Sequence, residues 1–284
     1  GNNTVTIKDV LSGEVWFCSG QSNMKYELRK LANARPKITE KKYEPVAAYI
    51  KREMETSQDE MLRQFTVAEN TSPLEPLETM SGQWVASSPE TNPDFSGTPY
   101  FFGRELRKEL NVPVGLIKCV WGGTPVESWM PAEAFQQDKG MAAYYEHQMS
   151  GLKKLIEKWD PKKAEATYQA ALQRQQAKGK GKGKGRKPKK QKDPKTSPKN
   201  ATTLFNGMVN PVIPYAIRGT IWYQGESHGA SIAHRYGPHF SAMISSWRKQ
   251  WAQGDFPFYF AQLANYNQPV TEPVEFNSWA LVCD

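Results

Sequence analysis

Short apolar runs that end in glycine-containing turns, alternating with helix-like segments, constrain the fold of this chain most. Four runs have the length and continuous apolar character of strands buried in a parallel sheet: 15–18, 114–120, 217–223 and 258–263. The first three lead directly into turns that contain glycine. Apolar residues recur at helical spacing in 100–110 and 239–251. This alternation predicts a three-layer α/β sandwich with a mostly parallel sheet.

Longer segments interrupt this alternation. Residues 28–62 are mixed, charged and punctuated by proline, which is typical of a helical excursion over the surface. Residues 144–177 have the pattern of a polar helical insertion. Residues 178–200 form a Lys- and Gly-rich insert that cannot bury apolar area, so we expect it to be disordered. The predicted organisation is one α/β domain over residues 13–284 with these insertions, preceded by residues 1–12 as the end of another domain or a linker.

The positive charge of the chain is concentrated in the Lys-rich insert. The formal net charge is +8, whereas residues 178–199 alone contain eleven Lys and Arg residues and one Asp. The rest of the chain is slightly acidic, so we expect no nucleic acid to bind to the folded part. Two interpretations of the insert stay open. It is either a weak contact for a polyanion, such as an acidic glycan, or a solvated loop.

The sequence gives no sign of a membrane span, a metal or a cofactor. No apolar run approaches the length of about 18 residues that a span requires. Residues 1–10 lack the basic end and the apolar core of a signal peptide. The three cysteines, Cys18, Cys119 and Cys283, are too scattered for a disulfide framework and form no Cys/His cluster. Cys18 and Cys119 lie in apolar runs, which predicts buried packing thiols.

A serine follows the first predicted strand where a nucleophile would be held. Ser22 is the third residue of the motif Gly-Gln-Ser-Asn-Met, on a tight turn between strand and helix. Its hydroxyl then lies at the edge of the sheet, and its own N–H points into the same space. A hydroxyl beside an oxyanion donor suits nucleophilic catalysis. The alternative is that Ser22 only caps the helix.

The turn after the second predicted strand offers backbone donors. Gly122 and Gly123 follow that strand, and glycines let backbone N–H groups approach a ligand closely. The next residues, Thr124 to Glu127, have the form of a capping box with proline at the first helical position. The alternative is a tight turn that needs glycine only for its backbone path.

The turn after the third predicted strand carries an amide and a carboxylate. Gln224 can donate from its amide to a developing oxyanion, and Glu226 lies in the same turn. Because the carboxyl ends of parallel strands lie at one edge of a sheet, the three turns are expected to converge on one pocket.

These motifs, in this order, resemble one family. EVWFCSGQSNM, LIKCVWGGTPVESW and IRGTIWYQGES are similar to motifs of the sialate O-acetylesterase branch of the SGNH (GDSL-like) hydrolases. FFGRELRKELNVPVGLI and FPFYFAQLANY resemble the same family. The resemblance implies a flavodoxin-like α/β/α fold and a metal-independent serine esterase that removes acetyl groups from sugars. It also implies a periplasmic or secreted location.

The resemblance assigns catalytic roles to four residues. Ser22 matches the nucleophile. The oxyanion hole is matched by three donors, which are the N–H of Ser22, an N–H of Gly122 or Gly123, and the side chain of Gln224.

Two further residues match positions that would support the substrate pocket. Asn23 and Glu226 are interpreted as supports for its walls. Gln21 belongs to the same motif, but the sequence suggests no chemical role for it.

The base that a serine esterase needs is missing from the recognised motifs. In the family, the catalytic Asp and His come from a late D-x-x-H motif, and this sequence contains none. Of the four histidines, His147 falls in the helical excursion, and His234 and His239 fall at the start of a helix, where polar surface is expected. His228 is nearest to the pocket and is the internal candidate for the base. We therefore expect a fragment that is incomplete at its carboxyl end.

Three classes of function follow from these observations. The first is a sugar O-acetylesterase that acts on O-acetyl sialate or, alternatively, on acetylated xylan. The second is an inactive carbohydrate-binding pseudo-esterase that keeps the pocket. The third is a polyanion-binding protein that acts through its basic insert.

Overall fold

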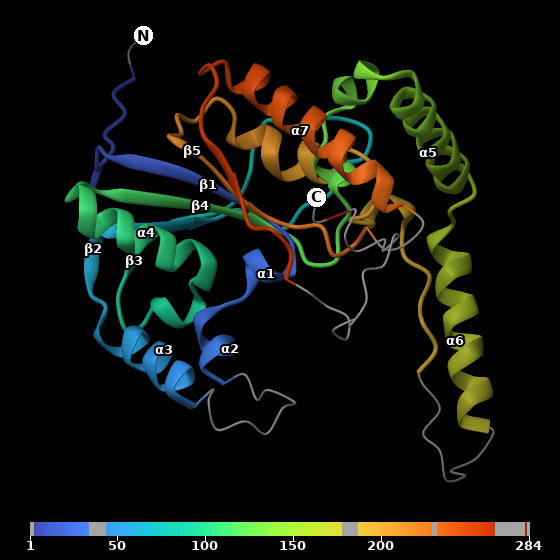
Figure 1. Ribbon diagram of the computed structural model, residues 1–284. Coiled ribbons are helices and arrows are strands. Elements are labelled where there is room, and N and C mark those ends of the chain that lie inside the picture. Colours follow the sequence, from blue (N-terminus) through green and yellow to red (C-terminus); the bar gives the residue numbers. More distant parts are fainter. Residues whose placement is uncertain (1–2, 34–43, 178–186, 229–231, 265–281, 283–284) are drawn as a thin grey trace, which may run out of the picture.

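Six strands form one sheet at the centre of the molecule (Figure 1). The computed structural model describes residues 3–33, 44–177, 187–228, 232–264 and 282, and within them the strand order is β3-β2-β4-β1-β5-β6. The strands are β1 (Glu14–Gly20), β2 (Asp59–Thr66), β3 (Trp84–Ser87), β4 (Val114–Val120), β5 (Gly219–Tyr223) and β6 (Phe258–Phe260). Neighbouring strands are parallel except for β2 and β3. The predicted α/β fold with a mostly parallel sheet is confirmed.

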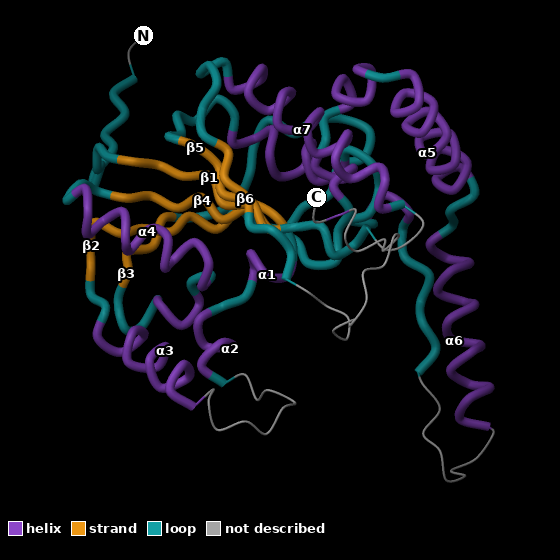
Figure 2. The backbone as a smooth tube through the Cα atoms, in the orientation of Figure 1, coloured by secondary structure: helices purple, strands orange, loops and turns teal. Residues whose placement is uncertain are grey.

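Helices cover both faces of this sheet, as Figure 2 shows. One face carries four helices: α1 (Ser22–Lys25), α2 (Leu28–Ala32), α3 (Glu44–Thr56) and α4 (Gly97–Leu110). On the other side lie α7 (Tyr236–Trp251) and, further out, α5 (Lys139–Glu157). Helix α6 (Pro161–Ala177) extends away from the sheet. Residues 144–177, which were expected to form a helical insertion, lie in α5, which begins earlier at Lys139, and in α6.

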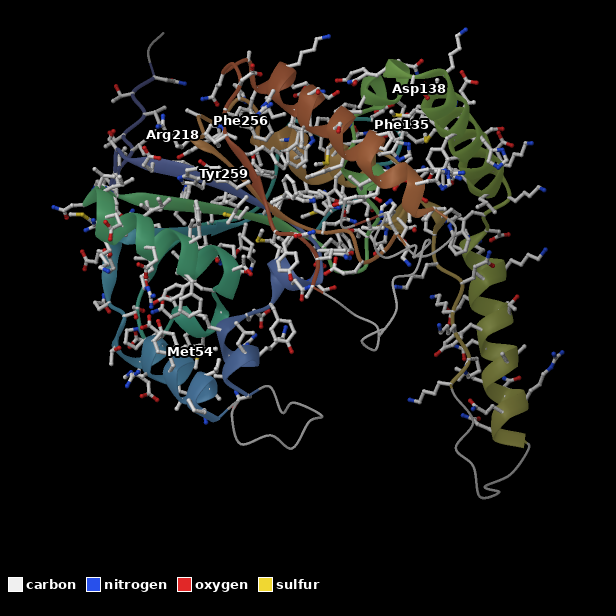
Figure 3. All side chains as sticks on the ribbon, viewed as in Figure 1. Met54, Phe135, Asp138, Arg218, Phe256 and Tyr259 are labelled. Carbon is white, nitrogen blue, oxygen red and sulfur yellow. The ribbon has the colours of Figure 1, made fainter. Side chains whose placement is uncertain are left out.

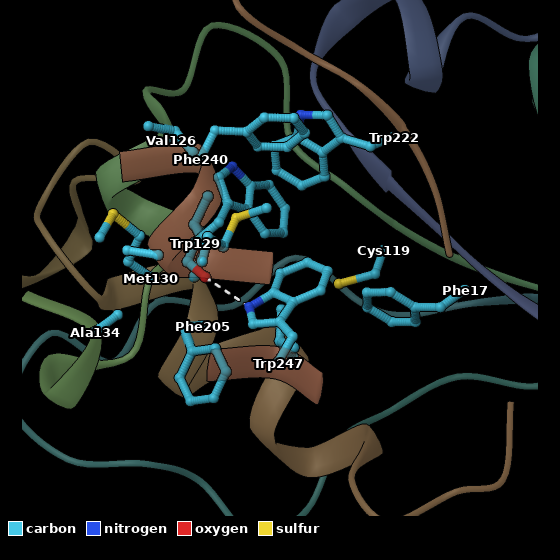
Figure 4. Packing of buried hydrophobic residues seen from close by; sticks show 14 of the residues in the cluster. Phe17, Cys119, Val126, Trp129, Met130, Ala134, Phe205, Trp222, Phe240 and Trp247 are labelled. Carbon is cyan, nitrogen blue, oxygen red and sulfur yellow. Dashed lines mark hydrogen bonds between the residues drawn. The ribbon is translucent and has the colours of Figure 1, made fainter. Parts of the chain in front are cut away.

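The residues of β1 alternate between two hydrophobic cores. Phe17 packs in the same core as Cys119 and Trp247 (Figure 4), whereas Trp16 and Cys18 pack in the core on the opposite face. This alternation follows from the period of two in a strand. Cys18 and Cys119 are both fully buried and free, which confirms their predicted role as packing thiols. The third cysteine lies outside the described residues.

Strands β2 and β3 are not predicted by the apolar pattern of the sequence. Helices α2 and α3 confirm the first part of the predicted excursion over residues 28–62, but β2 begins at Asp59. Leu62 and Gln64 are the buried residues of β2, and charged residues occupy other positions of the strand. A strand with so few buried residues has no continuous apolar run, so periodicity could not identify it.

The start of α5 is fixed by a capping residue and an aromatic contact. The Asp138 side chain accepts hydrogen bonds from Gly140 N at 2.8 Å and Met141 N at 3.1 Å, which satisfies donors at the helix N-terminus. The ring of Phe135 stacks on that of Tyr145 at 4.8 Å. Figure 3 labels Asp138 and Phe135 at this junction. The cap fixes where α5 begins, and the stack attaches α5 to the preceding 3-10 helix.

The Lys-rich insert is described in part. Residues 178–186 lie outside the described residues, so their expected disorder is not tested. Residues 187–200 follow a defined path that includes a short 3-10 helix, Pro194–Thr196, and an ion pair between Lys190 and Glu165 of α6. Disorder throughout 178–200 was therefore too broad an expectation. Contact with a polyanion stays a prediction.

The described helices show no membrane-spanning segment. None of them combines the length and the apolar character that crossing a bilayer requires.

Candidate active site

The carboxyl ends of three neighbouring strands bring the predicted site residues to one edge of the sheet. Strand β1 lies between β4 and β5. Gly20, at the end of β1, is paired with Val120 on one side and with Tyr223 on the other. The three turns identified in the sequence therefore start side by side.

The turn after β1 requires glycine at position 20. Gly20 has a φ of +139°, and a Cβ there would lie 2.2 Å from Tyr223 O. Gln21 N donates to the same oxygen at 3.0 Å. The chain then enters α1, in which Ser22 is the first residue and Gln21 occupies the N-cap position without a side-chain cap hydrogen bond. The alternative that Ser22 caps this helix is therefore wrong.

Ser22 is exposed and lies against the turn after β4. A Cβ built on Gly122 would be 3.2 Å from Ser22 Oγ, so the backbone at Gly122 closely approaches the hydroxyl. Gly123 has a φ of +73°, in the left-handed region that favours glycine. Among the hydrogen bonds of the described residues, none involves Ser22 Oγ. The hydroxyl is therefore accessible to a ligand.

Gln224 connects the turn after β5 to the turn after β4. Its side chain is buried, and its Nε2 donates to Thr124 O at 2.9 Å. This bond uses one of the two amide hydrogens of Gln224. The main-chain oxygen of Gln224 accepts a hydrogen bond from Tyr236 Oη at 2.9 Å. Both ends of the residue are therefore fixed.

A carboxylate connects the turns after β1 and β5. Glu226 accepts hydrogen bonds from Asn23 Nδ2 at 2.6 Å and from Gln21 Nε2. Ser227 Oγ donates to Gln21 Oε1 at 2.8 Å. Burial, and then the negative charge of Glu226, raise the pKa of the Tyr223 hydroxyl. Gln21, for which the sequence suggested no role, thus lies at the centre of this polar network.

A second carboxylate is buried beyond the turn after β4. Glu127 accepts one hydrogen bond on each oxygen, from His228 Nε2 at 2.9 Å and from His239 Nδ1 at 3.0 Å. The predicted surface position of His239 is wrong, because α7 directs this residue inward and leaves it 2% exposed. His228, the internal candidate for a base, is fully buried with its Nε2 on Glu127. Within the described residues no hydrogen bond connects it to Ser22.

The turn after β4 does not form the predicted capping box. Residues Val126–Trp129 form a 3-10 helix without a side-chain cap hydrogen bond. Thr124 Oγ1 instead donates to Trp121 O at 2.8 Å and accepts from Trp129 Nε1 at 3.0 Å. Thr124 thereby closes the turn that carries the two glycines. The local sequence does not predict this role, because it depends on the hydrogen bond from the Trp129 side chain.

Metal binding finds no support among the residues that the structure describes. The described residues contain no group of three or more His, Cys, Asp or Glu side chains that could hold a metal ion.

Comparisons with known proteins agree with the fold and the motifs. The family model described as carbohydrate esterase, sialic acid-specific acetylesterase, matches residues 12–185 and 196–280. The chain belongs to this family. It is 27% identical over 276 residues to the sialate O-acetylesterase of Homo sapiens and 27% identical over 281 residues to that of Rattus norvegicus. Each alignment covers 93% of this chain, but 42% of the human protein and 46% of the rat protein.

A solved structure supports the same relationship. The crystal structure of a carbohydrate acetylesterase from Xanthomonas citri is 26% identical and superposes with a TM-score of 0.64. The superposition covers 95% of this chain and 45% of that protein. The chain thus spans less than half the length of these relatives.

Proposed function

We propose that this chain carries the nucleophile and the oxyanion hole of a serine esterase that removes O-acetyl groups from carbohydrates. The observation that carries the proposal is the exposed Ser22 at the start of α1, with the backbone of Gly122 against its hydroxyl. Membership of a carbohydrate esterase family supports an acetylated sugar as the substrate. O-acetyl sialate and acetylated xylan are the two sugars to compare.

In the proposed reaction, Ser22 Oγ attacks the carbonyl carbon of the acetyl ester and gives its proton to a base. The negative charge that develops on the carbonyl oxygen is stabilised by N–H groups of Ser22 and of Gly122 or Gly123, and by the free amide hydrogen of Gln224. The sugar oxygen leaves with a proton, and water then releases acetate from the acetylated serine.

The pocket walls belong to the same proposal. A hydrogen bond joins Asn23 to Glu226. Asn23 follows Ser22 in the chain, and Glu226 lies in the neighbouring turn after β5. We assign both residues to supporting the pocket, because their hydrogen bond fixes the turn that carries Ser22 relative to the turn after β5. A secreted or periplasmic location is part of the expectation from the family.

The base limits the activity that we expect. Within the described residues no imidazole is hydrogen-bonded to Ser22, and the sequence contains no D-x-x-H motif. A serine without a base stays protonated at neutral pH and is a poor nucleophile. We therefore expect slow turnover, since an oxyanion hole without a complete triad leaves about 10³–10⁴-fold catalysis over water. The same observation favours a second candidate, a protein that binds acetylated sugars without turning them over.

The test is acetate release from O-acetylated sialate and from acetylated xylan. Ser22→Ala serves as the control, and sugar binding is measured by calorimetry for both proteins. Slow release that disappears in Ser22→Ala supports the esterase. Binding without any Ser22-dependent release supports the second candidate. If the chain shows neither sugar binding nor acetate release, both candidate functions are contradicted.

A further inference from the structure

The buried group of Glu127, His228 and His239 has no part in the proposed acyl transfer. Glu127 and His228 nevertheless follow closely in sequence on the proposed oxyanion donors Gly123 and Gln224. Glu127 is 2% exposed, His228 is fully buried and His239 is 2% exposed. We call these three residues the carboxylate clamp. They come from three different elements, which are the 3-10 helix after β4, the turn after β5, and α7.

Both oxygens of the Glu127 carboxylate have a hydrogen-bond donor in the clamp, whether the imidazoles are neutral or charged. Each oxygen of Glu127 receives one ring N–H, from His228 Nε2 at 2.9 Å and His239 Nδ1 at 3.0 Å. Two neutral imidazoles suffice for these bonds, because each has one N–H. The bonds also fix the orientation of both rings. A carboxylate bonded in this way on both oxygens is held at one position.

Burial of Glu127 would by itself raise the pKa of the carboxyl. The hydrogen bonds from His228 and His239, together with the charge of His228, outweigh burial and hold that pKa well below its usual range. Among the described residues, the other titratable or charged groups near the clamp include Tyr144, Tyr236 and Arg235. Burial and the charge of Glu127 raise the pKa of Tyr144 to about 12, and the Arg235 guanidinium lies 5.0 Å from the centre of its ring. The hydrogen bonds from the two imidazoles therefore favour the ionised form of Glu127.

The first connection of the clamp leads to the glycine turn. Glu127 is three residues after Thr124, whose hydroxyl closes the turn on Trp121 O and Trp129 Nε1. Thr202 N donates to Glu127 O at 2.9 Å, so the main chain is held as well. The Glu127 side chain is therefore carried by the same short, hydrogen-bonded segment as Gly122 and Gly123.

The second connection leads to Gln224. The His228 ring contacts the Tyr236 ring edge-on at 5.0 Å, and Tyr236 Oη donates to Gln224 O. His228 N also donates to Gly225 O at 2.9 Å. The imidazole on Glu127 is thus joined to the turn in which Gln224 lies, and Gln224 is joined back to Thr124 O. The result is a closed ring of contacts around two of the three proposed oxyanion donors, the glycine N–H and the Gln224 amide.

We propose that Glu127 is a positioning residue for the proposed oxyanion hole: through His228 and His239 it fixes the turn after β4 on the turn after β5. The proposal rests on the proposed function for its catalytic meaning. Glu127 does not touch the substrate. It acts by keeping the Gly122/Gly123 N–H groups and the Gln224 amide at the spacing that a tetrahedral oxyanion requires.

The experiment compares Ser22-dependent hydrolysis of p-nitrophenyl acetate in four variants of the full chain. Glu127→Gln removes the charge, and His239→Leu removes one of the two donors to Glu127. His239→Asn keeps a donor close to the position of Nδ1. The matched control is Glu133→Gln, since Glu133 also accepts a hydrogen bond from an α7 side chain, Gln250, but lies outside the clamp. Circular dichroism establishes that each variant is folded at the assay temperature.

We expect kcat to fall about tenfold to a hundredfold in Glu127→Gln and His239→Leu, with KM within about threefold. His239→Asn should restore most of the loss, and Glu133→Gln should match the parent chain. A purely structural clamp would lower the melting temperature without this kcat loss in the folded protein. Folded His239→Leu with the kcat of Glu133→Gln would overturn the proposal.

A second measurement does not require turnover. The Trp129 indole N–H donates to Thr124 Oγ1, so its hydrogen exchange reports the closure of the glycine turn. We expect exchange at least about tenfold faster in Glu127→Gln than in Glu133→Gln, after assignment of the signal with Trp129→Phe. Equal exchange would overturn the clamp. If the parent chain and Ser22→Ala hydrolyse the ester equally, the proposed function fails in this chain, and the indole measurement still decides whether the clamp fixes the turn.

Discussion

Two glutamates at the same edge of the sheet are held in opposite ways. Glu127 follows β4, is almost fully buried and accepts hydrogen bonds from two imidazoles. Glu226 follows β5, is part-exposed and accepts hydrogen bonds from two neutral amides, those of Gln21 and Asn23. Each carboxylate has two donors and connects two turns. They differ in their surroundings, since Glu127 lies in the interior and Glu226 is part-exposed, and in the turns that they connect.

The two glutamates hold the turns from two directions, one from the part-exposed edge and one from the interior. Glu226 connects the nucleophile turn to the turn after β5 at a part-exposed position. Water can replace its hydrogen bond from the exposed Asn23, whereas Gln21 is buried. Glu127 connects the glycine turn to α7 in the interior, where a lost partner leaves a buried polar group unsatisfied. The buried brace should therefore matter far more for stability. The surface brace should matter mainly for what binds beside Ser22.

The largest effect should come from removing the buried charge. Glu127→Gln is expected to destabilise the fold by about 3 kcal/mol, because one imidazole loses its acceptor in the interior. In a chain of this size that is a fall in melting temperature of roughly 10 °C. Thermal unfolding at pH 7 measures it. A fall no greater than that of Glu226→Gln would remove the distinction between the two glutamates.

The pH dependence of that effect should follow the lowered pKa of Glu127. A carboxyl whose pKa is lower in the folded than in the unfolded state stabilises the fold above its unfolded pKa, near 4.5, and this stabilisation is lost as the pH falls toward the folded value. The stability difference between the parent chain and Glu127→Gln should thus be larger at pH 6 than at pH 3.5. Denaturant unfolding at the two pH values tests this, and a difference that grows on acidification would contradict the assignment.

A smaller effect is expected at the surface brace. Glu226→Gln should change the free energy of unfolding by less than about 1 kcal/mol, since the part-exposed site is open to water. The variant should still weaken sugar binding or raise KM, because one of the amides of Gln21 and Asn23 must rotate to find an acceptor. Calorimetric titration with an acetylated sugar provides the measurement. A loss of stability equal to that of Glu127→Gln would mean that both braces are structural.

The smallest effect should be that of Asn23→Ala. Gln21 still bonds to Glu226 in this variant, so we expect a change in unfolding free energy of about 0.5 kcal/mol or less. Sugar affinity should fall by a few-fold at most. A larger loss of affinity than in Glu226→Gln would indicate that Asn23 contacts the sugar directly.

The sequence predicted the central sheet and the residues at its carboxyl edge, because both depend on local patterns. The continuous apolar runs of β1, β4 and β5 identify buried parallel strands, and the glycines after them identify sharp turns. Ser22, Gly122 and Gln224 could be placed at one edge from this pattern alone. Strand β2 escaped detection, since its buried residues are too few to form an apolar run.

The carboxylate clamp could not be predicted, because its three members are joined only in space. Glu127 and His228 are separated by 101 positions and Glu127 and His239 by 112. In the local sequence, Glu127 has the form of a capping residue, and His239 has the form of a polar helix position. The packing of α7 and of the turn after β5 against the 3-10 helix after β4 brings them together.

Gly20 has a consequence for which sequences this fold can accept. Any larger side chain at that position would have to pass through Tyr223 O, which lies 2.2 Å from the place of its first carbon, and would also have to adopt a φ of +139°. In a library that samples every amino acid at each position, position 20 should retain glycine almost exclusively when selection is for folding alone. Position 22, whose side chain faces solvent, should accept many replacements under the same selection. The serine becomes indispensable only when the library is selected for chemistry, so comparing the two selections would separate what the turn needs from what the reaction needs.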